Sequence, residues 1–171
     1  MQFFSISAAL AAAFIAAGAE AHKITLHNNC GFAVGLHLSN WPGHAAYTGP
    51  AIGTLAAHSS KAITVPSGWD GRICDQKGGC GGGNCYGKCS MTEFNMDASG
   101  LNYYDISNIQ AYTVAQRISS SCGSVTCTSA SCSCEQAYGI GNTAGTCSGS
   151  STRDRPVRAC GGGDFTITYC P

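Results

Sequence analysis

Hydrophobic and polar residues alternate with a period of two in several short segments of the chain. Residues 23–28 (KITLHN) place Ile24 and Leu26 on one face, and residues 32–38 (FAVGLHL) place four apolar side chains opposite His37. The same alternation occurs in residues 62–65 (AITV), 91–96 (MTEFNM), 111–118 (AYTVAQRI) and 165–170 (FTITYC). A period of two is typical of β-strands, because successive side chains point to opposite faces of a sheet.

Loops rich in Gly, Ser and Asn separate these segments, and no segment has the apolar stripe of an amphipathic helix. Several short strands with turn signals between them predict an all-β protein, built as an antiparallel sandwich or barrel. Residues 119–151 differ, because they are rich in Ser, Thr, Gly and Cys and poor in apolar side chains. We expect this segment to be a loop-dominated excursion held by disulfide bonds.

The first 21 residues have the pattern of a secretory signal peptide. Residues 8–17 are apolar, no acidic residue precedes Glu20, and the segment ends in the small-x-small tripeptide Ala19-Glu20-Ala21. The usual positive charges are missing, but the apolar run is too short to cross a bilayer. We expect cleavage after Ala21, with cleavage after Ala19 as the alternative. The mature chain, residues 22–171, is then a single secreted, extracellular domain.

Charge and cysteine content narrow the function classes. Without Glu20 the chain keeps nine basic and eight acidic residues, so its net charge is near +1. This balance argues against nucleic acid or an anionic membrane as the main partner. All twelve cysteines follow residue 29, and an even number in an oxidising compartment predicts disulfide bonds. No later segment is apolar enough to span a membrane, and we expect a monomer.

Residues 74–89 (CDQKGGCGGGNCYGKC) contain four cysteines and six glycines. Zinc sites usually have cysteines paired at a spacing of two to four residues, whereas five, four and three residues separate these cysteines. Residues 82–88 imitate a phosphate-binding loop, but Cys89 replaces the Ser or Thr that binds magnesium, and no helical pattern follows. We therefore expect disulfide loops closed by tight glycine turns, with no metal and no cofactor.

Three stretches of the chain resemble the thaumatin-like family. They are residues 24–34 (ITLHNNCGFAV), 93–114 (EFNMDASGLNYYDISNIQAYTV) and 165–171 (FTITYCP). Members of this family open with a strand leading to N-x-C, carry a Glu-Phe strand and an Asp-Ile-Ser segment, and end in F-C-P or Y-C-P. The resemblance implies a two-sheet antiparallel sandwich with disulfide-stapled loops. The chain is similar to the small members, with the shortening mostly between Cys132 and Cys147.

The resemblance also implies a disulfide pairing, which the sequence alone does not give, because six bonds can be arranged in thousands of ways. The implied bonds are Cys30–Cys170, Cys74–Cys80, Cys85–Cys89, Cys122–Cys160 and Cys127–Cys147. Cys132 and Cys134 remain. We expect a strained bridge between them, and the alternatives are two free thiols or an intermolecular bond.

Many thaumatin-like proteins have an acidic cleft of one Arg, one Glu and three Asp, implicated in binding or hydrolysing β-1,3-glucan. Glu93 and Asp105 match the Glu and one Asp, and Asp154 matches another through its D-x-P context. Gln110 replaces the third Asp, and Arg72 is one residue from the expected spacing. Because glycoside hydrolysis needs a protonated acid and a carboxylate, Glu93 and Asp105 are the candidate catalytic pair, with Glu93 as the acid. The alternative is that Glu93 is a solvated strand carboxylate and that Asp105 is a turn or capping residue that hydrogen-bonds its own backbone.

Aromatic residues near these positions are candidates for stacking on sugars. Tyr104, beside Asp105, is the candidate substrate-binding residue, although strand alternation should bury one of Tyr103 and Tyr104. Trp69 is a further candidate, and Trp41 is expected to be a loop anchor.

His22 would be the first residue of the mature chain. Copper-dependent polysaccharide oxygenases begin with histidine, but the first strand resembles thaumatin-like proteins. We expect His22 to be a frayed terminal residue.

Together these patterns predict a secreted protein that binds cell-wall β-1,3-glucan through Glu93 and Asp105 and serves wall remodelling, antifungal defence or host interaction. One alternative is an endo-β-1,3-glucanase that uses the same residues. Another is an antimicrobial or protein-interaction module without carbohydrate activity. We expect catalysis to be weak or absent, because Gln110 removes one carboxylate and the short excursion removes part of a cleft wall.

Overall fold

The computed structural model describes residues 21–80 and 84–171, and these residues form eleven β-strands and no helix. The expected signal peptide, except Ala21, lies outside the described residues. The strands are β1 (His22–Asn28), β2 (Val34–Asn40), β3 (Gly53–Leu55), β4 (Ser60–Val65), β5 (Asp70–Asp75), β6 (Met91–Ala98), β7 (Leu101–Ser107), β8 (Gln116–Ser120), β9 (Gly123–Cys127), β10 (Arg158–Cys160) and β11 (Phe165–Tyr169). The all-β prediction is confirmed.

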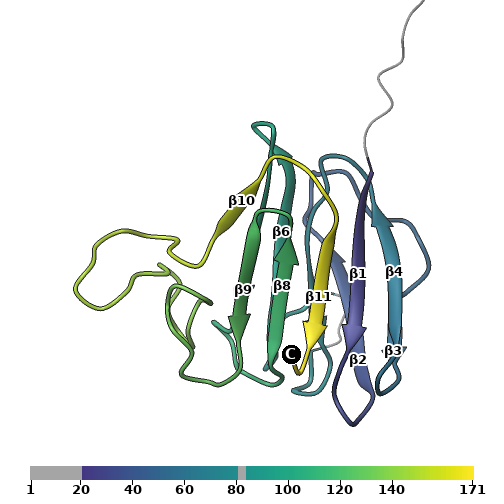
Figure 1. Cartoon of the computed structure of the whole chain (residues 1–171), viewed down its shortest axis with the longest axis horizontal. Coiled ribbons are helices and arrows are strands. Elements are labelled where there is room, and N and C mark those ends of the chain that lie inside the picture. Colours follow the sequence, from purple (N-terminus) through teal and green to yellow (C-terminus); the bar gives the residue numbers. More distant parts are fainter. Residues whose placement is uncertain (1–20, 81–83) are drawn as a thin grey trace, which may run out of the picture.

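The strands form two sheets that pack face to face (Figure 1). The five-stranded sheet has the order β4-β1-β11-β8-β9, and the six-stranded sheet has the order β10-β7-β6-β5-β2-β3. The first and last strands, β1 and β11, are parallel neighbours in the middle of the five-stranded sheet, whereas the other strand pairs are antiparallel. The predicted two-sheet sandwich is confirmed, and the first and last strands of the chain pair within one sheet.

The core lies between the sheets, where the inward faces of both meet. Phe165 of β11 meets Phe94 of β6 edge to face at 5.5 Å between ring centroids, and Tyr104 of β7 at 5.2 Å. Ile24 and Leu26 of β1 are fully buried. The alternation predicted for β1, β6 and β11 is therefore confirmed, because every second side chain enters the same core.

The alternation predicted from residue 32 onward holds only in part. Val34 and Leu36 are buried, but Phe32 precedes β2 and is 47% exposed. Its ring instead receives the Lys77 ammonium at 5.1 Å. Toward the end of β2, Leu38 lies opposite the buried Ile73 and packs against the core, although it is only half-buried. Ser39 lies opposite Arg72 on the other face of the sheet.

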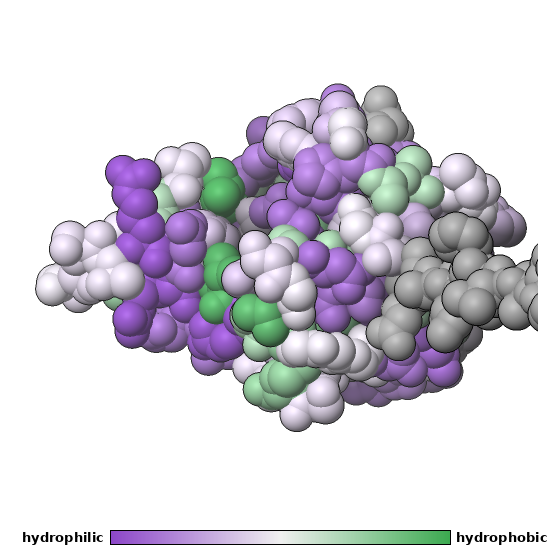
Figure 2. All heavy atoms as spheres, turned by 90° about the horizontal axis from the view of Figure 1, so that it is seen from above, coloured by the Kyte–Doolittle hydropathy of each residue, from purple (hydrophilic) through white to green (hydrophobic). Residues whose placement is uncertain are grey.

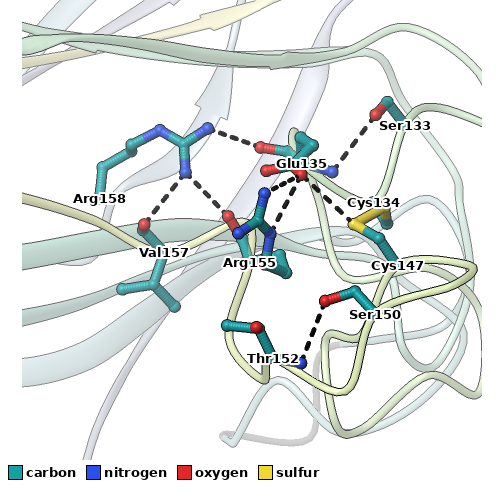
Figure 3. A network of polar contacts seen from close by, with 9 residues as sticks. All are labelled: Ser133, Cys134, Glu135, Cys147, Ser150, Thr152, Arg155, Val157 and Arg158. Carbon is teal, nitrogen blue, oxygen red and sulfur yellow. Dashed lines mark hydrogen bonds and ion pairs between the residues drawn. A yellow bond between two sulfur atoms is a disulfide. The ribbon is translucent and has the colours of Figure 1, made fainter.

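The excursion begins later than predicted, because residues 116–127 form the β8–β9 hairpin. The segment after Cys127 extends from one side of the sandwich (Figure 1). Figure 3 shows the contacts that hold it: the Arg155 guanidinium bonds the Glu135 carboxylate, with Nε 3.0 Å from Oε1, and Arg158 donates to the Glu135 carbonyl at 2.7 Å. A disulfide bond between Cys134 and Cys147 closes the same loop. This segment has few apolar side chains, and it is held by an ion pair, hydrogen bonds and disulfide bonds.

All twelve cysteines are disulfide-bonded. The structure contains Cys30–Cys170 and Cys122–Cys160, two of the pairs that the resemblance implied. The other four expected pairs, Cys74–Cys80, Cys85–Cys89, Cys127–Cys147 and Cys132–Cys134, are wrong. The structure has Cys74–Cys85, Cys80–Cys89, Cys127–Cys132 and Cys134–Cys147 in their place.

Local backbone geometry accounts for the corrected pairs. Cys74 of β5 lies opposite His37 of β2, and the Cys85 sulfur lies 3.6 Å from the His37 carbonyl, so Cys85 comes back to Cys74. Directly after β9, a turn in which the Cys132 amide donates to the Ser129 carbonyl at 3.2 Å returns Cys132 to Cys127. Cys134 is then left for Cys147.

The surface of the molecule is largely polar where Figure 2 shows it. Hydrophilic residues cover most of that face, and hydrophobic residues appear as small, separate groups. Within the described residues, no helix is long and apolar enough to cross a membrane.

Candidate functional site

Three charged side chains form a row across the outer face of the six-stranded sheet. Arg72 of β5 lies directly opposite Glu93 of β6, and Glu93 lies opposite Asp105 of β7. Directly opposed residues share a face of the sheet, and the neighbouring Phe94 points into the core. The structure therefore brings together three of the residues predicted for the site. We call Arg72, Glu93 and Asp105 the charged row.

Arg72 and Glu93 form a loose ion pair in the row. Nη1 of Arg72 lies 3.7 Å from Oε1 of Glu93, and the two side chains are 11% and 30% exposed. A partly solvated pair at this distance contributes little to stability. The Glu93 carboxylate therefore keeps oxygen atoms available for a ligand on the outer face.

Asp105, the third residue of the row, is half-buried. Its Oδ1 is buried without a hydrogen-bond partner among the described residues. Burial, followed by the charges of Glu93 and Asp154, holds the pKa of Asp105 well above its usual range, and Arg72 opposes the shift only in part. The raised pKa favours the protonated form of Asp105. Glu93 as the acid stays a prediction.

Asp154 follows the excursion in the chain and lies close enough to Asp105 for its charge to act on that carboxyl. Tyr138 donates its hydroxyl to Oδ1 of Asp154 at 2.5 Å, and the Asp154 amide donates to the Ala144 carbonyl at 3.1 Å. Burial, this hydrogen bond and the nearby carboxylates raise the pKa of Tyr138. Tyr138 also bridges to Ser107, two residues beyond Asp105. Sequence reasoning missed Tyr138, because its segment shows no strand pattern.

Gln110 supports a loop. Its side-chain Oε1 accepts the Gly87 amide at 2.7 Å and so ties the end of β7 to the cysteine-rich segment. Gly87 has a φ of 133°, which favours glycine at this anchor point. Gln110 as a substrate-binding residue stays a prediction.

Tyr104 as a substrate-binding residue is wrong. It is 1% exposed, lies opposite Phe94 on the inner face, and its hydroxyl is 3.0 Å from the Ser120 hydroxyl. Because Asp105 points outward, strand alternation turns its neighbour Tyr104 inward. Trp69 is also fully buried, so it offers no ring face to a ligand.

Two other aromatic rings flank the charged row. The guanidinium carbon of Arg72 lies 4.9 Å from the ring centroid of Trp41 and 5.4 Å from that of Tyr86. Trp41 is 44% exposed and Tyr86 is 55% exposed. Together with Ser39, Asn40, Pro42, Arg72 and Asn84 they line a groove of about 560 Å³. Tyr86 was missed, and its place beside Cys85 in a glycine-rich loop is the signal that could have marked it.

His22 is not frayed, contrary to the prediction. It is 6% exposed, and its Nε2 lies 2.9 Å from Oδ2 of Asp97. Burial acts against ionisation of Asp97, but hydrogen bonds from His22, Gly68 and Ser67 lower its pKa. Within residues 21–80 and 84–171, His, Cys, Asp and Glu side chains form no group of three that could hold a metal ion.

The raised pKa of Asp105 should make the stability of the protein depend on pH. Replacing Asp105 with Asn is expected to raise the melting temperature at pH 7 and to leave it unchanged near pH 3. The native state binds this proton more tightly than the unfolded chain does, so wild-type stability falls as the pH rises from about 4 through the native pKa. Asn removes that loss, and each kcal/mol regained raises the melting temperature by about 2–4 °C.

Thermal unfolding at both pH values, followed by circular dichroism, measures this difference. The exposed Asp164 provides the control, because Asp164→Asn should change little at either pH. A wild type that is more stable than Asp105→Asn at pH 7 would contradict the expected ionisation of the row.

Comparison with known proteins finds relatives of similar sequence and structure. No family model matches it. It is 32% identical to thaumatin-like protein PWIR2 of Triticum aestivum over 93% of this chain and 94% of that protein. It is also 32% identical to thaumatin-like pathogenesis-related protein 2 of Avena sativa over 93% of each. The structure of the thaumatin-like xylanase inhibitor TLXI superposes with a TM-score of 0.61 and 18% identity, covering 86% of this chain and 99% of the inhibitor.

Proposed function

Because the chain belongs to the thaumatin-like family, we propose that it is a secreted protein. We propose that it binds cell-wall β-1,3-glucan with the outer face of its six-stranded sheet. The observation that carries the proposal is the charged row, Arg72, Glu93 and Asp105, on three adjacent strands. A relative named as pathogenesis-related supports a role in defence.

The row offers hydrogen-bonding groups of both kinds to a neutral polysaccharide. Arg72 donates from its guanidinium, the Glu93 carboxylate accepts, and a protonated Asp105 both donates and accepts. Sugar hydroxyls can serve as partners for each of these groups. Hydrogen bonds to charged groups are the stronger ones, so Glu93 and Arg72 provide most of the polar attraction.

A pull-down on insoluble β-1,3-glucan, combined with a reducing-sugar assay, tests this function. Retention without release of reducing ends supports a binding protein. Retention with release supports the enzyme. Absence of both leaves a protein-interaction or antimicrobial module, and the proposal fails.

Replacing Glu93 with Gln is expected to weaken retention on glucan by about 1–3 kcal/mol, the range for one hydrogen bond to a charged group. The change keeps the size of the side chain and removes its charge. Depletion isotherms on the insoluble polymer measure the dissociation constant. Asp164→Asn is the matched control, because it removes an exposed carboxylate outside the row. Equal retention of the Glu93→Gln variant and the wild type would remove Glu93 from the binding surface.

An endo-β-1,3-glucanase is the second candidate function. The raised pKa of Asp105 beside Glu93 favours it, because glycoside hydrolysis uses one protonated and one ionised carboxyl group. In that case Glu93→Gln lowers turnover by roughly 10²-fold or more, the scale of general acid–base catalysis. Release of reducing ends by wild type and variant, at equal bound protein, distinguishes this loss from weaker binding.

A further inference from the structure

We propose that Trp41 and Tyr86 form an aromatic subsite that binds a neutral pyranose ring in the groove above Arg72. The inference rests on the proposed function in one respect, since both place a polysaccharide on the outer face of the six-stranded sheet. It adds residues outside the charged row and restricts the charge of the sugar.

The geometry of the groove fits a sugar ring. Arg72 occupies one face of each aromatic ring, at 4.9 Å from the Trp41 centroid and 5.4 Å from the Tyr86 centroid. Both rings are still about half exposed. A groove of about 560 Å³ is within the usual size of ligand sites. Pyranose rings carry apolar C–H faces that pack on such rings, and Ser39 and Asn84 line the same groove with polar groups for sugar hydroxyls.

Both rings are held in place by the fold. The Trp41 amide donates to the Asp70 carbonyl at 2.8 Å, at the start of β5. Tyr86 follows Cys85, which is bonded to Cys74 two residues beyond Arg72. The Tyr86 amide also donates to Oδ1 of Asn84 at 3.1 Å. A site on supported positions loses little conformational entropy when a ligand binds.

Charge in the groove favours a neutral sugar. Arg72 is the cation between the rings, and Glu93 already opposes it at 3.7 Å. Asp70 lies close enough for the charge of Arg72 to act on it, and it also faces His44 at 3.7 Å. An anionic sugar would therefore meet two carboxylates for one guanidinium. The hydroxyl groups of a neutral sugar avoid that repulsion.

The chain contains two tryptophans, and their different exposure makes the test direct. Trp41 is 44% exposed, whereas Trp69 is fully buried. Titration with a soluble β-1,3-linked glucose hexasaccharide should therefore change the fluorescence of Trp41 in a saturable way. Trp41→Phe should abolish this change, because only Trp69 remains. A hexamer of galacturonic acid, of similar length but anionic, should give no saturable change.

Substitutions at Tyr86 measure how much its ring contributes to hexasaccharide binding. Tyr86→Ala should weaken hexasaccharide binding by about tenfold or more, the scale for truncating an aromatic anchor. Tyr86→Phe should restore it to within about twofold, because the ring face is kept. Phe32→Ala is the matched control, since Phe32 is an exposed ring that packs on Lys77 outside this groove. It should bind like the wild type.

The outcomes separate this inference from the proposed function. If the wild type is retained on β-1,3-glucan and the variants Trp41→Ala and Tyr86→Ala are retained equally well, the subsite is overturned and the proposed function is kept. If the wild type does not bind β-1,3-glucan, the proposed function fails, and hexamers of β-1,4-glucose, β-1,4-xylose and chitin are titrated next. A saturable Trp41 signal that depends on Tyr86 with any of these supports the subsite. No signal with any of them overturns it.

Discussion

Loss of the Cys30–Cys170 bond through the double variant Cys30→Ser, Cys170→Ser is expected to lower the free energy of unfolding by about 5 kcal/mol. The bond spans 140 residues, and the entropy that a cross-link removes from the unfolded chain grows with the length of the closed loop. Domains of ordinary stability have only about 5–15 kcal/mol, so the variant should be poorly secreted. Urea unfolding of the refolded protein measures the loss.

The native contacts around this bond explain why the effect lies mainly in the unfolded chain. The Asn29 amide donates to the Tyr169 carbonyl at 3.0 Å, and the Cys170 amide donates to the Ala115 carbonyl at 2.9 Å. These hydrogen bonds can persist without the disulfide. Removing Cys127–Cys132, which spans five residues, is the comparison and should cost only about 2 kcal/mol. Equal losses in the two double variants would contradict this assignment of structural weight.

Replacing Phe165 with Ala is expected to cost about 3–5 kcal/mol, the range for truncating a buried phenylalanine. Phe165 is fully buried in β11 and joins the two sheets through Phe94 and Tyr104. The cavity would lie between the sheets, where neither can collapse without moving the other. Urea unfolding measures the loss, and an unchanged slope with urea concentration shows that the two-state transition is kept.

Phe165→Leu should cost markedly less, since most of the volume is retained. Phe32→Ala should change stability by less than about 0.5 kcal/mol, because that ring is exposed. If Phe165→Ala were as mild as Phe32→Ala, the core would not lie between the two sheets.

The sequence predicted the strands that follow a simple alternation and missed those that break it. In β6, Phe94 and Met96 alternate with Glu93, so both the strand and the outward carboxylate were predictable. At the start of β7 the polar residue is buried and the apolar one is exposed: Asn102 is 2% exposed and Leu101 is 36% exposed. The Asn102 side chain accepts the Asp97 amide at 2.9 Å, a tertiary contact that no local pattern reveals.

The family resemblance implied the observed disulfide bond only for Cys30–Cys170 and Cys122–Cys160, whose cysteines lie far apart in the chain. Cys74, Cys80, Cys85 and Cys89 pack with Met91 in a single buried cluster. In such a cluster several pairings are sterically close, so sequence separation does not select among them. The turn that returns Cys132 to Cys127 likewise depends on one backbone hydrogen bond.

The charged residues of the site were predictable from the family resemblance, and the aromatic residues were not. Glu93 and Asp105 lie on paired strands, so motifs close in sequence also lie close in space. Trp41 and Tyr86 come from separate loops, and each packs on the Arg72 guanidinium, a tertiary contact that no local pattern reveals. The prediction for Tyr104 was wrong because adjacent residues of a strand point to opposite faces, and in this pair Asp105 is the one that faces outward.

Binding of a glucan to the outer face of the six-stranded sheet is tested by nuclear magnetic resonance of the isotope-labelled protein, titrated with the soluble β-1,3-linked glucose hexasaccharide. We expect saturable shifts of the amide signals of Arg72, Glu93 and Asp105 and of the Trp41 indole signal. Residues of β1 and β11, on the other sheet, should not shift. Shifts confined to the five-stranded sheet or to the excursion, or no shift at any concentration of the sugar, would contradict binding to this outer face.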